Sequence, residues 1–384
     1  DRTPFYAEGG GQLADAGTVR TTTGAVVDVV DVQSPVAGLV VHRGLVTSGE
    51  VVLGDTVRAE VDVERRRSIS RAHTATHMVH KAIREALGET ATQAGSENAP
   101  GRFRFDFSAS GAVPPSVLRD VEQRVNTLLA DDLEVTAEVM TQEQARAAGA
   151  MALFGEKYGD AVRVVSVGDW AKELCGGTHV GRTGDIGLFK IVAESGVAAG
   201  VRRVEAVTGD NALAYVQELE ALSAAMSGYL KASRGEHLSR VAQVLDQVRT
   251  LEKEVAALKG KLASSQGDEL MSQAVDIKGL KVLAAKLEGA DARTLRETMD
   301  KLKDKLKTAV IVLAAVDGDK VQIAAGVTAD SVGKVKAGEL VNFVAQQVGG
   351  KGGGKADMAM AGGTDASRLP AALQSVQAWV AERA

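Results

Sequence analysis

The stretch SISRAHTATHMVHKAIREAL, residues 68–87, decides how the first half of this chain is organised. Its apolar residues recur at helical spacing, and Gly88 stands where the C-cap of a helix belongs. These apolar positions are Ile69, Ala72, Ala75, Val79, Ala82, Ile83 and Ala86. The stretch therefore predicts a helix. Because His73 and His77 are four residues apart, both imidazoles should lie on one face of it.

The segments around this helix alternate between apolar and polar residues, as β-strands do. Strands are expected near residues 26–32, 39–42, 56–61, 102–107, 133–140 and 162–167, and a second helix near 115–129. Residues 1–209 are therefore predicted to form an α+β domain.

Residues 210–268 are predicted to form a helical hairpin or coiled-coil arm, because turn residues are scarce there and apolar residues follow steps of three and four. The apolar positions are Leu238, Val241, Leu245, Val248, Leu251, Val255, Leu258 and Leu262. One pair of consecutive three-residue steps makes this seam imperfect, which favours a packed helix pair over a long free-standing coiled coil.

Residues 269–384 are predicted to form a small α/β domain. Strands are expected at 282–287, 310–316 and 321–327, and helices around 295–306, 338–348 and 370–383. Between the last two helices lies the glycine-rich stretch GGKGGGK, residues 349–355.

This glycine-rich stretch matches the Walker A pattern up to its last lysine. Ala356, however, stands where Ser or Thr would bind Mg²⁺, and the stretch follows a predicted helix rather than a strand, so nucleotide hydrolysis is disfavoured. A loop whose backbone N–H groups, with Lys351 and Lys355, hold nucleic-acid phosphates is the prediction. A plain surface loop is the alternative.

Composition limits the possible functions. The chain has 45 Lys and Arg against 50 Asp and Glu, but residues 270–384 carry 16 against 13, so phosphate contacts are expected there. Aromatic residues make up only 3%, which argues against a base-stacking surface. No apolar run approaches the ~20 residues that span a bilayer, so no membrane contact is expected.

The cysteine count and the first residues of the chain bear on the cellular compartment and on processing. A single cysteine, Cys175, excludes an intramolecular disulfide and favours a reducing cytoplasm. The chain opens at Asp1 without a signal-peptide pattern, which suggests a piece of a longer protein.

A second pair of metal-binding side chains occurs in Cys175-Gly-Gly-Thr-His179, where the glycines let the backbone bend tightly around an ion. The short metalloprotease motif needs a glutamate where Thr74 stands, so protease chemistry is disfavoured. Either pair alone is a weak indication of metal binding. Together they predict a zinc site, with ligands His73, His77, Cys175 and His179.

Several motifs, taken in order, resemble the editing domain of alanyl-tRNA synthetases. They are TPFYAE at 3–8, GGQ at 10–12, HTATH at 73–77, GS at 95–96, RFDF at 104–107 and CGGTH at 175–179. Their order and spacing match across residues 1–209. Similar motifs occur in threonyl-tRNA synthetase editing domains and in free-standing trans-editing proteins. The glycine-rich stretch, with Asp357-Met358-Ala359 and Gly362-Gly363, is similar to the DHHA1-type C-terminal domain of the alanine enzyme.

This resemblance implies a zinc-dependent deacylase that removes serine or glycine from mischarged tRNA(Ala), the partner, within an alanine–tRNA ligase whose aminoacylation core lies elsewhere. It implies zinc on the two pairs above, with Gln93 at the family's active-site glutamine. We expect Gln93 and Thr178 to be neutral hydrogen-bonding groups for the substrate or the water. The implied tRNA contacts are Lys351, Gly352, Gly353, Gly354 and Lys355.

Departures from the family pattern concentrate near Gln93. Gly9 replaces the usual Ser, Ala94 the usual Lys, and Glu97-Asn98 an apolar pair, which weakens the transfer of substrate contacts to the loop expected from Gln93 to Asn98. Two alternatives stay open: a free-standing trans-editing deacylase, and a tRNA-binding and dimerisation module whose editing site is inactive. A homodimer through the helical arm or the C-terminal domain is also possible on this pattern.

Overall fold

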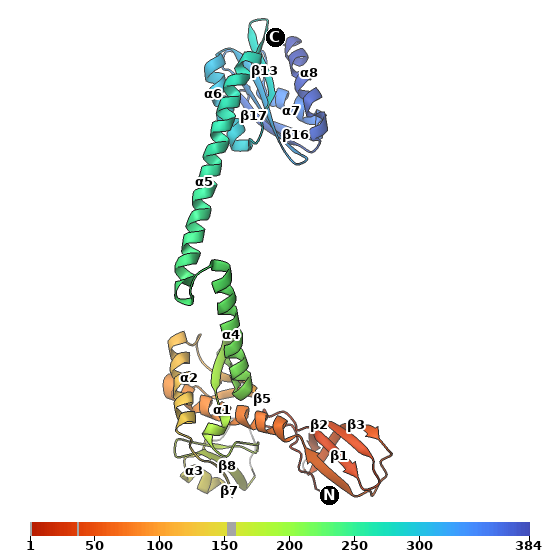
Figure 1. Ribbon diagram of the computed structural model, residues 1–384, viewed down its shortest axis with the longest axis vertical. Coiled ribbons are helices and arrows are strands. Elements are labelled where there is room, and N and C mark those ends of the chain that lie inside the picture. The colour runs from red at the N-terminus through yellow and green to blue at the C-terminus, as the bar shows by residue number, and fades with distance from the viewer. Residues whose placement is uncertain (1, 37, 152–158) are drawn as a thin grey trace. The chain divides into compact units, whose positions relative to one another are not determined.

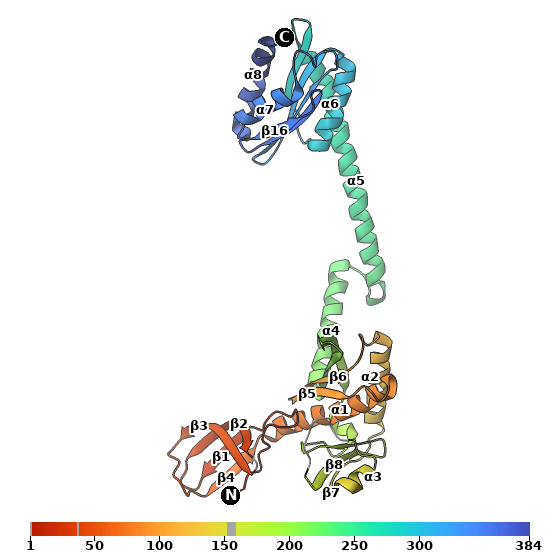
Figure 2. The ribbon, with the colours of Figure 1, turned by 180° about the vertical axis from the view of Figure 1, so that it is seen from behind.

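A computed structural model describes residues 2–36, 38–151 and 159–384 of the protein. The chain divides into two compact units, Asp1–Tyr229 and Leu230–Ala384. Figure 1 and Figure 2 show their elements from opposite sides. Among the described residues, every helix is too short or too polar to cross a lipid bilayer.

The first unit is organised around helix α1 (Val63–Leu87), which contains the predicted helix. The carboxylate of Asp62 caps its start by accepting the N–H of Arg65 at 3.0 Å, and Gly88 ends it with a φ of 100°. Residues 72–80 are all buried. A helix buried on every side is a central element rather than a surface one, so its polar side chains must find partners inside the protein.

An antiparallel sheet with the order β10-β11-β6-β5 packs against α1. Its strands are β5 (Gln93–Ala99), β6 (Arg102–Ser108), β10 (Phe189–Ala198) and β11 (Val201–Thr208). Strand β6 alternates, so Phe103, Phe105 and Phe107 all enter the core that Met78 and Val79 of α1 also join. This packing fixes α1 against the sheet.

The rest of the first unit completes the surroundings of α1. Figure 1 shows the sheet β3-β2-β1-β4 at the start of that helix. The remaining elements are β1 (Gly17–Thr21), β2 (Val26–Val36), β3 (Leu39–Ser48), β4 (Val57–Val61), α2 (Pro115–Ala130), β7 (Val135–Thr141), α3 (Gln142–Ala147), β8 (Ala161–Val167), β9 (Ala171–Leu174) and the first turns of α4 (Gly209–Leu230). Strands β7, β8 and β9 form a third antiparallel sheet.

The prediction of a loop from Gln93 to Asn98 is wrong, because these residues form strand β5. The strand pairs with β6 in the register Gln93↔Phe107 and Ser96↔Phe105, with a bulge between Gln93 and Gly95. Small polar residues of low β propensity hide this strand in the sequence. Backbone pairing with a phenylalanine-rich neighbour makes it a strand nonetheless.

The predicted helical arm corresponds to α4 and to α5 (His237–Leu270), separated by a break in which Lys231 has a φ of 48°. Several apolar residues of α5, including Leu238, Leu245 and Leu258, are exposed. The packing of the two helices as a pair, and the domain limits at 209 and 268, remain predictions.

The second unit contains a six-stranded sheet with the order β12-β13-β14-β15-β17-β16. Strands β13 and β14 are parallel and are joined through α6, while the other neighbours are antiparallel. Helix α6 covers one face, and α7 and α8 cover the other. The elements are β12 (Val275–Ile277), β13 (Leu280–Lys286), α6 (Ala292–Leu306), β14 (Ala309–Asp317), β15 (Lys320–Val327), α7 (Ala337–Gln347), β16 (Lys351–Gly354), β17 (Met358–Gly363) and α8 (Leu369–Ala381).

The prediction that residues 351–354 belong to a loop is also wrong, because they form the edge strand β16. The glycines have a structural reason: a Cβ on Gly352 would lie 2.6 Å from the Cα of Ala361, and one on Gly354 would lie 2.7 Å from the Cα of Ala359. Strand β17 therefore approaches too closely for side chains at these positions. Lys351 and Lys355 remain exposed at the two ends of the strand.

This close approach predicts different effects for two adjacent glycines. Gly352→Ala should lower the free energy of unfolding of the second unit by about 1–3 kcal/mol, because the new methyl group overlaps β17. Gly353→Ala, whose Cβ would meet nothing within 4 Å, should change it by less than about 0.5 kcal/mol. Urea unfolding of both variants measures the difference, and equal stabilities would contradict the role assigned to Gly352.

Candidate metal centre

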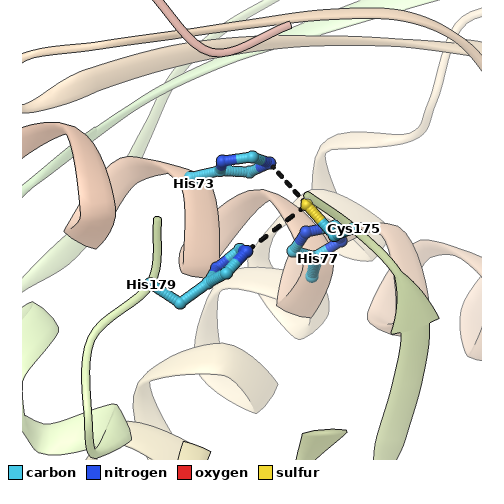
Figure 3. A group of neighbouring side chains, drawn as sticks. All are labelled: His73, His77, Cys175 and His179. Carbon is cyan, nitrogen blue, oxygen red and sulfur yellow. Dashed lines mark hydrogen bonds between the residues drawn. The ribbon is translucent and has the colours of Figure 1, made fainter. Parts of the chain in front are cut away.

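The four side chains predicted to bind metal come together from three places in the first unit. Helix α1 supplies His73 and His77, Cys175 follows directly on β9, and His179 lies on the loop beyond it (Figure 3). Their ligand atoms all lie within 4.8 Å of one another. Both histidines of α1 are buried, whereas the other two side chains are half-buried.

Each imidazole is held through its Nδ1 atom by a different oxygen. The Nδ1 of His73 donates to Gln12 Oε1 at 2.8 Å, and that of His179 lies 3.1 Å from Thr74 Oγ1. The Nδ1 of His77 makes a short contact with the carboxylate of Glu173. These contacts orient each ring through its Nδ1 atom, so that all three Nε2 atoms face another partner.

The remaining nitrogens surround the thiol. The Nε2 of His73 and that of His179 lie 3.4 and 3.3 Å from Cys175 Sγ, and the buried Nε2 of His77 has no hydrogen-bond partner among the described residues. A tetrahedral zinc ion bound by nitrogen and sulfur places these atoms ~3.5 Å apart. One sulfur and three nitrogen donors at these separations therefore fit zinc.

The charges of the centre are also suited to a cation. Burial tends to lower the pKa of His77, but the negative charges of Glu173 and Cys175 and hydrogen bonds to them together outweigh burial and raise the pKa to about 10. Burial tends to raise the pKa of Cys175, but the charge on His77 and hydrogen bonds from His179 and His73 lower it to about 2. Burial lowers the pKa of His179 to about 3. The thiolate and two neutral imidazoles are ready to bind a metal, and only His77 must first release a proton.

Sequence reasoning assigned no role to two side chains that support this centre, Glu173 and Gln12. Glu173 holds a second imidazole, since His80 Nδ1 lies 2.9 Å from its Oε1 atom. Gln12 is fully buried, and its Oε1 also accepts the N–H of Thr178 at 2.8 Å. In the sequence, the signals for these roles are the position of Glu173 two residues before Cys175 and that of Gln12 directly after a run of glycines.

Gln93 and Thr178, the predicted hydrogen-bonding groups, lie in different surroundings. Gln93 and Ser96 line a small hollow of about 30 Å³ together with His73, His77 and Cys175, which we call the metal-side hollow. The Gln93 amide donates to Ser96 Oγ at 3.3 Å. The hydroxyl of Thr178 accepts from the Gln12 amide at 2.9 Å and pairs with Ser70 Oγ at 2.8 Å, so it supports the centre from within the protein.

Three family models match separate parts of the chain. Residues 1–65 match "tRNA synthetases class II (A)", residues 162–205 match the threonyl and alanyl tRNA synthetase second additional domain, and residues 279–382 match the DHHA1 domain. The second match contains Glu173, Cys175 and His179. Such a combination of models indicates a tRNA synthetase family.

Curated relatives decide which family this is. Alanine–tRNA ligases from Polaromonas sp. (strain JS666 / ATCC BAA-500), Polaromonas naphthalenivorans and Acidovorax sp. are 66%, 64% and 61% identical, and their alignments cover the whole of this chain. The chain belongs to the alanyl-tRNA synthetase family. It spans about 44% of the length of these relatives.

A solved structure is similar to part of this synthetase-family chain. The C-Ala domain of Aquifex aeolicus alanyl-tRNA synthetase is 27% identical, with 28% of this chain and 97% of that chain covered and a TM-score of 0.27.

The loop around Cys175 provides a test with a matched control. A Cβ on Gly177 would overlap the His73 ring and lie 2.7 Å from Gln12 Oε1, whereas one on Gly176 would meet nothing within 4 Å. Gly177→Ala should therefore displace His73 and lower zinc affinity by about 10–100-fold, the usual effect of disturbing groups that orient metal ligands. Gly176→Ala should bind zinc as the unaltered chain does. Competition with a chromophoric chelator measures both affinities, and equal values would refute the contact assigned to Gly177.

Proposed function

We propose that the first unit is the editing site of an alanine–tRNA ligase and hydrolyses serine or glycine from mischarged tRNA(Ala), with zinc as its cofactor. The observation that carries this proposal is the metal-side hollow, where Gln93 and Ser96 lie beside the predicted zinc ligands. Its volume of about 30 Å³ is close to that of one water molecule. A hollow of this size has room for the attacking water, with the aminoacyl ester held at its mouth.

The need for such a site follows from the limited selectivity of the pocket that binds alanine for aminoacylation. A pocket for alanine cannot exclude the smaller glycine by steric clash, and an apolar pocket rejects an added hydroxyl by only ~10²-fold. Polar groups that hydrogen-bond the serine hydroxyl reject alanine by ~10⁴-fold or more, because a methyl group leaves them unpaired. Gln93 and Ser96 supply such groups.

The reaction is the addition of water to the ester carbonyl, followed by cleavage of the bond between that carbon and the ribose oxygen, which takes a proton. Zinc, when bound by the three histidines and Cys175, supplies positive charge that polarises groups next to it. Four protein donors fill a tetrahedral shell, so the attacking water is better assigned to the polar groups of the metal-side hollow. The carboxamide oxygen of Gln93 can accept a hydrogen bond from that water, and its N–H group can donate one to the carbonyl oxygen. Thr178 acts one step back, through Gln12.

Other parts of the proposal concern partners and setting. The DHHA1-like second unit would bind tRNA(Ala), and the exposed apolar side chains on α5, such as Leu245 and Leu258, would favour a second copy of the chain as a partner. A cytoplasmic protein is consistent with a lone free thiol at the metal centre. Two alternative functions differ in activity. A free-standing trans-editing enzyme would catalyse the same hydrolysis, whereas a tRNA-binding module with an inactive centre would not.

Deacylation assays separate an active editing site from a tRNA-binding module with an inactive centre. The chain should hydrolyse seryl-tRNA(Ala), lose this activity with a chelator, and regain it with Zn²⁺. Gln93→Ala should lower kcat by about 10²-fold, since removing one neutral group that binds the reacting atoms costs about this much, while zinc content stays unchanged. Alanyl-tRNA(Ala) is the control substrate and should persist. A zinc-loaded chain that leaves seryl-tRNA(Ala) intact would establish the inactive module instead.

The second unit is proposed to bind tRNA through Lys351 and Lys355. The double variant Lys351→Ala with Lys355→Ala should weaken tRNA(Ala) binding and reduce the slope of log affinity against log salt by ~0.7–0.9 for each lost phosphate contact. A titration at several salt concentrations measures this slope. Lys320→Ala, on the hairpin that joins β14 and β15, is the matched control. Unchanged affinity in the double variant would place the tRNA contacts elsewhere.

A further inference from the structure

A second and larger hollow adjoins the metal centre on the side of His179. Its volume is about 510 Å³, and we call it the arginine hollow. The first turns of α1 form one wall with Arg66, Arg67, Ser70 and Arg71, and the segment from His179 to Asp185 forms the other. Both walls lie within the first unit.

The three arginines are not equivalent. Arg66 forms an ion pair with the buried carboxylate of Asp15, and Arg67 pairs at the surface with Glu64 at 2.9 Å. Arg71 donates from Nε to a neutral acceptor, the carbonyl oxygen of Asp185, at 2.7 Å. No carboxylate among the described residues lies within ion-pair distance of Arg71. Its guanidinium is therefore oriented by the protein while its charge is left for another partner.

The carboxylate of Asp185 also borders the arginine hollow. It accepts the backbone N–H of Arg182 at 3.1 Å, and this bond offsets part of its charge. The first turn of α1 adds the positive end of a 25-residue helix on the opposite wall. The balance of charge around the hollow therefore favours an anion.

The arginine hollow is close to the proposed site of hydrolysis. Arg71 precedes the ligand His73 by two residues, which is a rise of ~3 Å along the helix. Ser70 bonds Thr178, and Thr178 bonds Gln12, which holds His73. The two hollows are therefore close enough for one molecule to place an anion here and an ester in the metal-side hollow.

We infer that the arginine hollow binds a backbone phosphate of the acceptor end of the aminoacyl-tRNA, with Arg71 as the phosphate-binding side chain. This inference rests on the proposed function, because it takes the substrate to be an ester at the end of an RNA strand. A guanidinium can donate two parallel hydrogen bonds to a phosphate, and the terminal nitrogens of Arg71 are the groups positioned to do so. A phosphate contact does not depend on the identity of the base. The arginine hollow therefore binds the strand, and the metal-side hollow discriminates between amino acids.

The test uses the full chain loaded with zinc and a short uncharged RNA that ends in CCA. Arg71→Ala should weaken RNA binding about tenfold and reduce the salt slope by ~0.7, the value for one phosphate of a single strand. Arg71→Lys should retain part of the affinity, because it keeps the charge and loses the paired donors. Arg58→Ala, at an exposed arginine of β4, is the control and should bind RNA normally. Zinc content, measured for each variant, reports whether the centre stays folded.

Hydrolysis of seryl-tRNA(Ala) provides the second readout. Arg71→Ala should raise KM and leave kcat unchanged, since binding rather than the chemical step is lost. RNA affinity that is unchanged in Arg71→Ala, or equally reduced in Arg58→Ala, would overturn the inference even if hydrolysis is observed. Arg71-dependent RNA binding without any hydrolysis would keep the phosphate site and reject the editing function. Inorganic phosphate that binds through Arg71 while RNA affinity does not depend on Arg71 would identify a free-anion site and overturn the assignment to RNA.

Discussion

The rest of the first unit depends on how five polar side chains are satisfied inside a buried helix. Residues 72–80 of α1 include three histidines and two threonines, and every one is buried. A buried polar group without a partner costs several kcal/mol, so α1 can pack here only if neighbouring elements supply acceptors. Gln12, Glu173 and Asn98 do so for His73, His77 and Thr76. The side chains that allow α1 to be buried therefore also position the metal centre.

The two negative charges of the centre, on Glu173 and Cys175, need a positive charge between them. The carboxylate of Glu173 keeps a proton on His77, and this imidazolium in turn stabilises the thiolate of Cys175. A metal held by the three histidines and Cys175 would supply positive charge between the two anions in place of that proton. Glu173 would then be the carboxylate that orients His77 and increases its basicity. The same residue therefore stabilises the centre in both situations, and its contact with His80 holds it in place.

The sequence was informative wherever periodicity or ligand spacing carried the signal, and uninformative where pairing did. The helix around His73, the alternating Phe103 to Phe107 strand and the placement of the two ligand pairs followed from the spacing of side chains. Strands β5 and β16 were predicted as loops, because their small residues have low β propensity and do not reveal the pairing of each with the next strand along the chain. Glycines misled the assignment of secondary structure, because Gly352 permits close pairing of β16 with β17, whereas a run of glycines in a sequence resembles a loop. Gln12 was invisible as a support because its partners lie 61 and 166 residues away.

The bonds of Gln12 connect two parts of the chain that different family models describe. Gln12 belongs to residues 1–65, which match the class II synthetase model, whereas Thr178 belongs to the second additional domain. Its carboxamide bonds Thr178 on one side and His73 on the other. Gly11 allows the N-terminal segment to lie close to β5, since a Cβ at this position would lie 2.8 Å from the carbonyl oxygen of Ser96. The metal centre is thus complete only when the N-terminal segment is docked against α1 and β5. Displacing that segment would remove the hydrogen bonds that orient His73 and Thr178 together, because a single buried amide makes both.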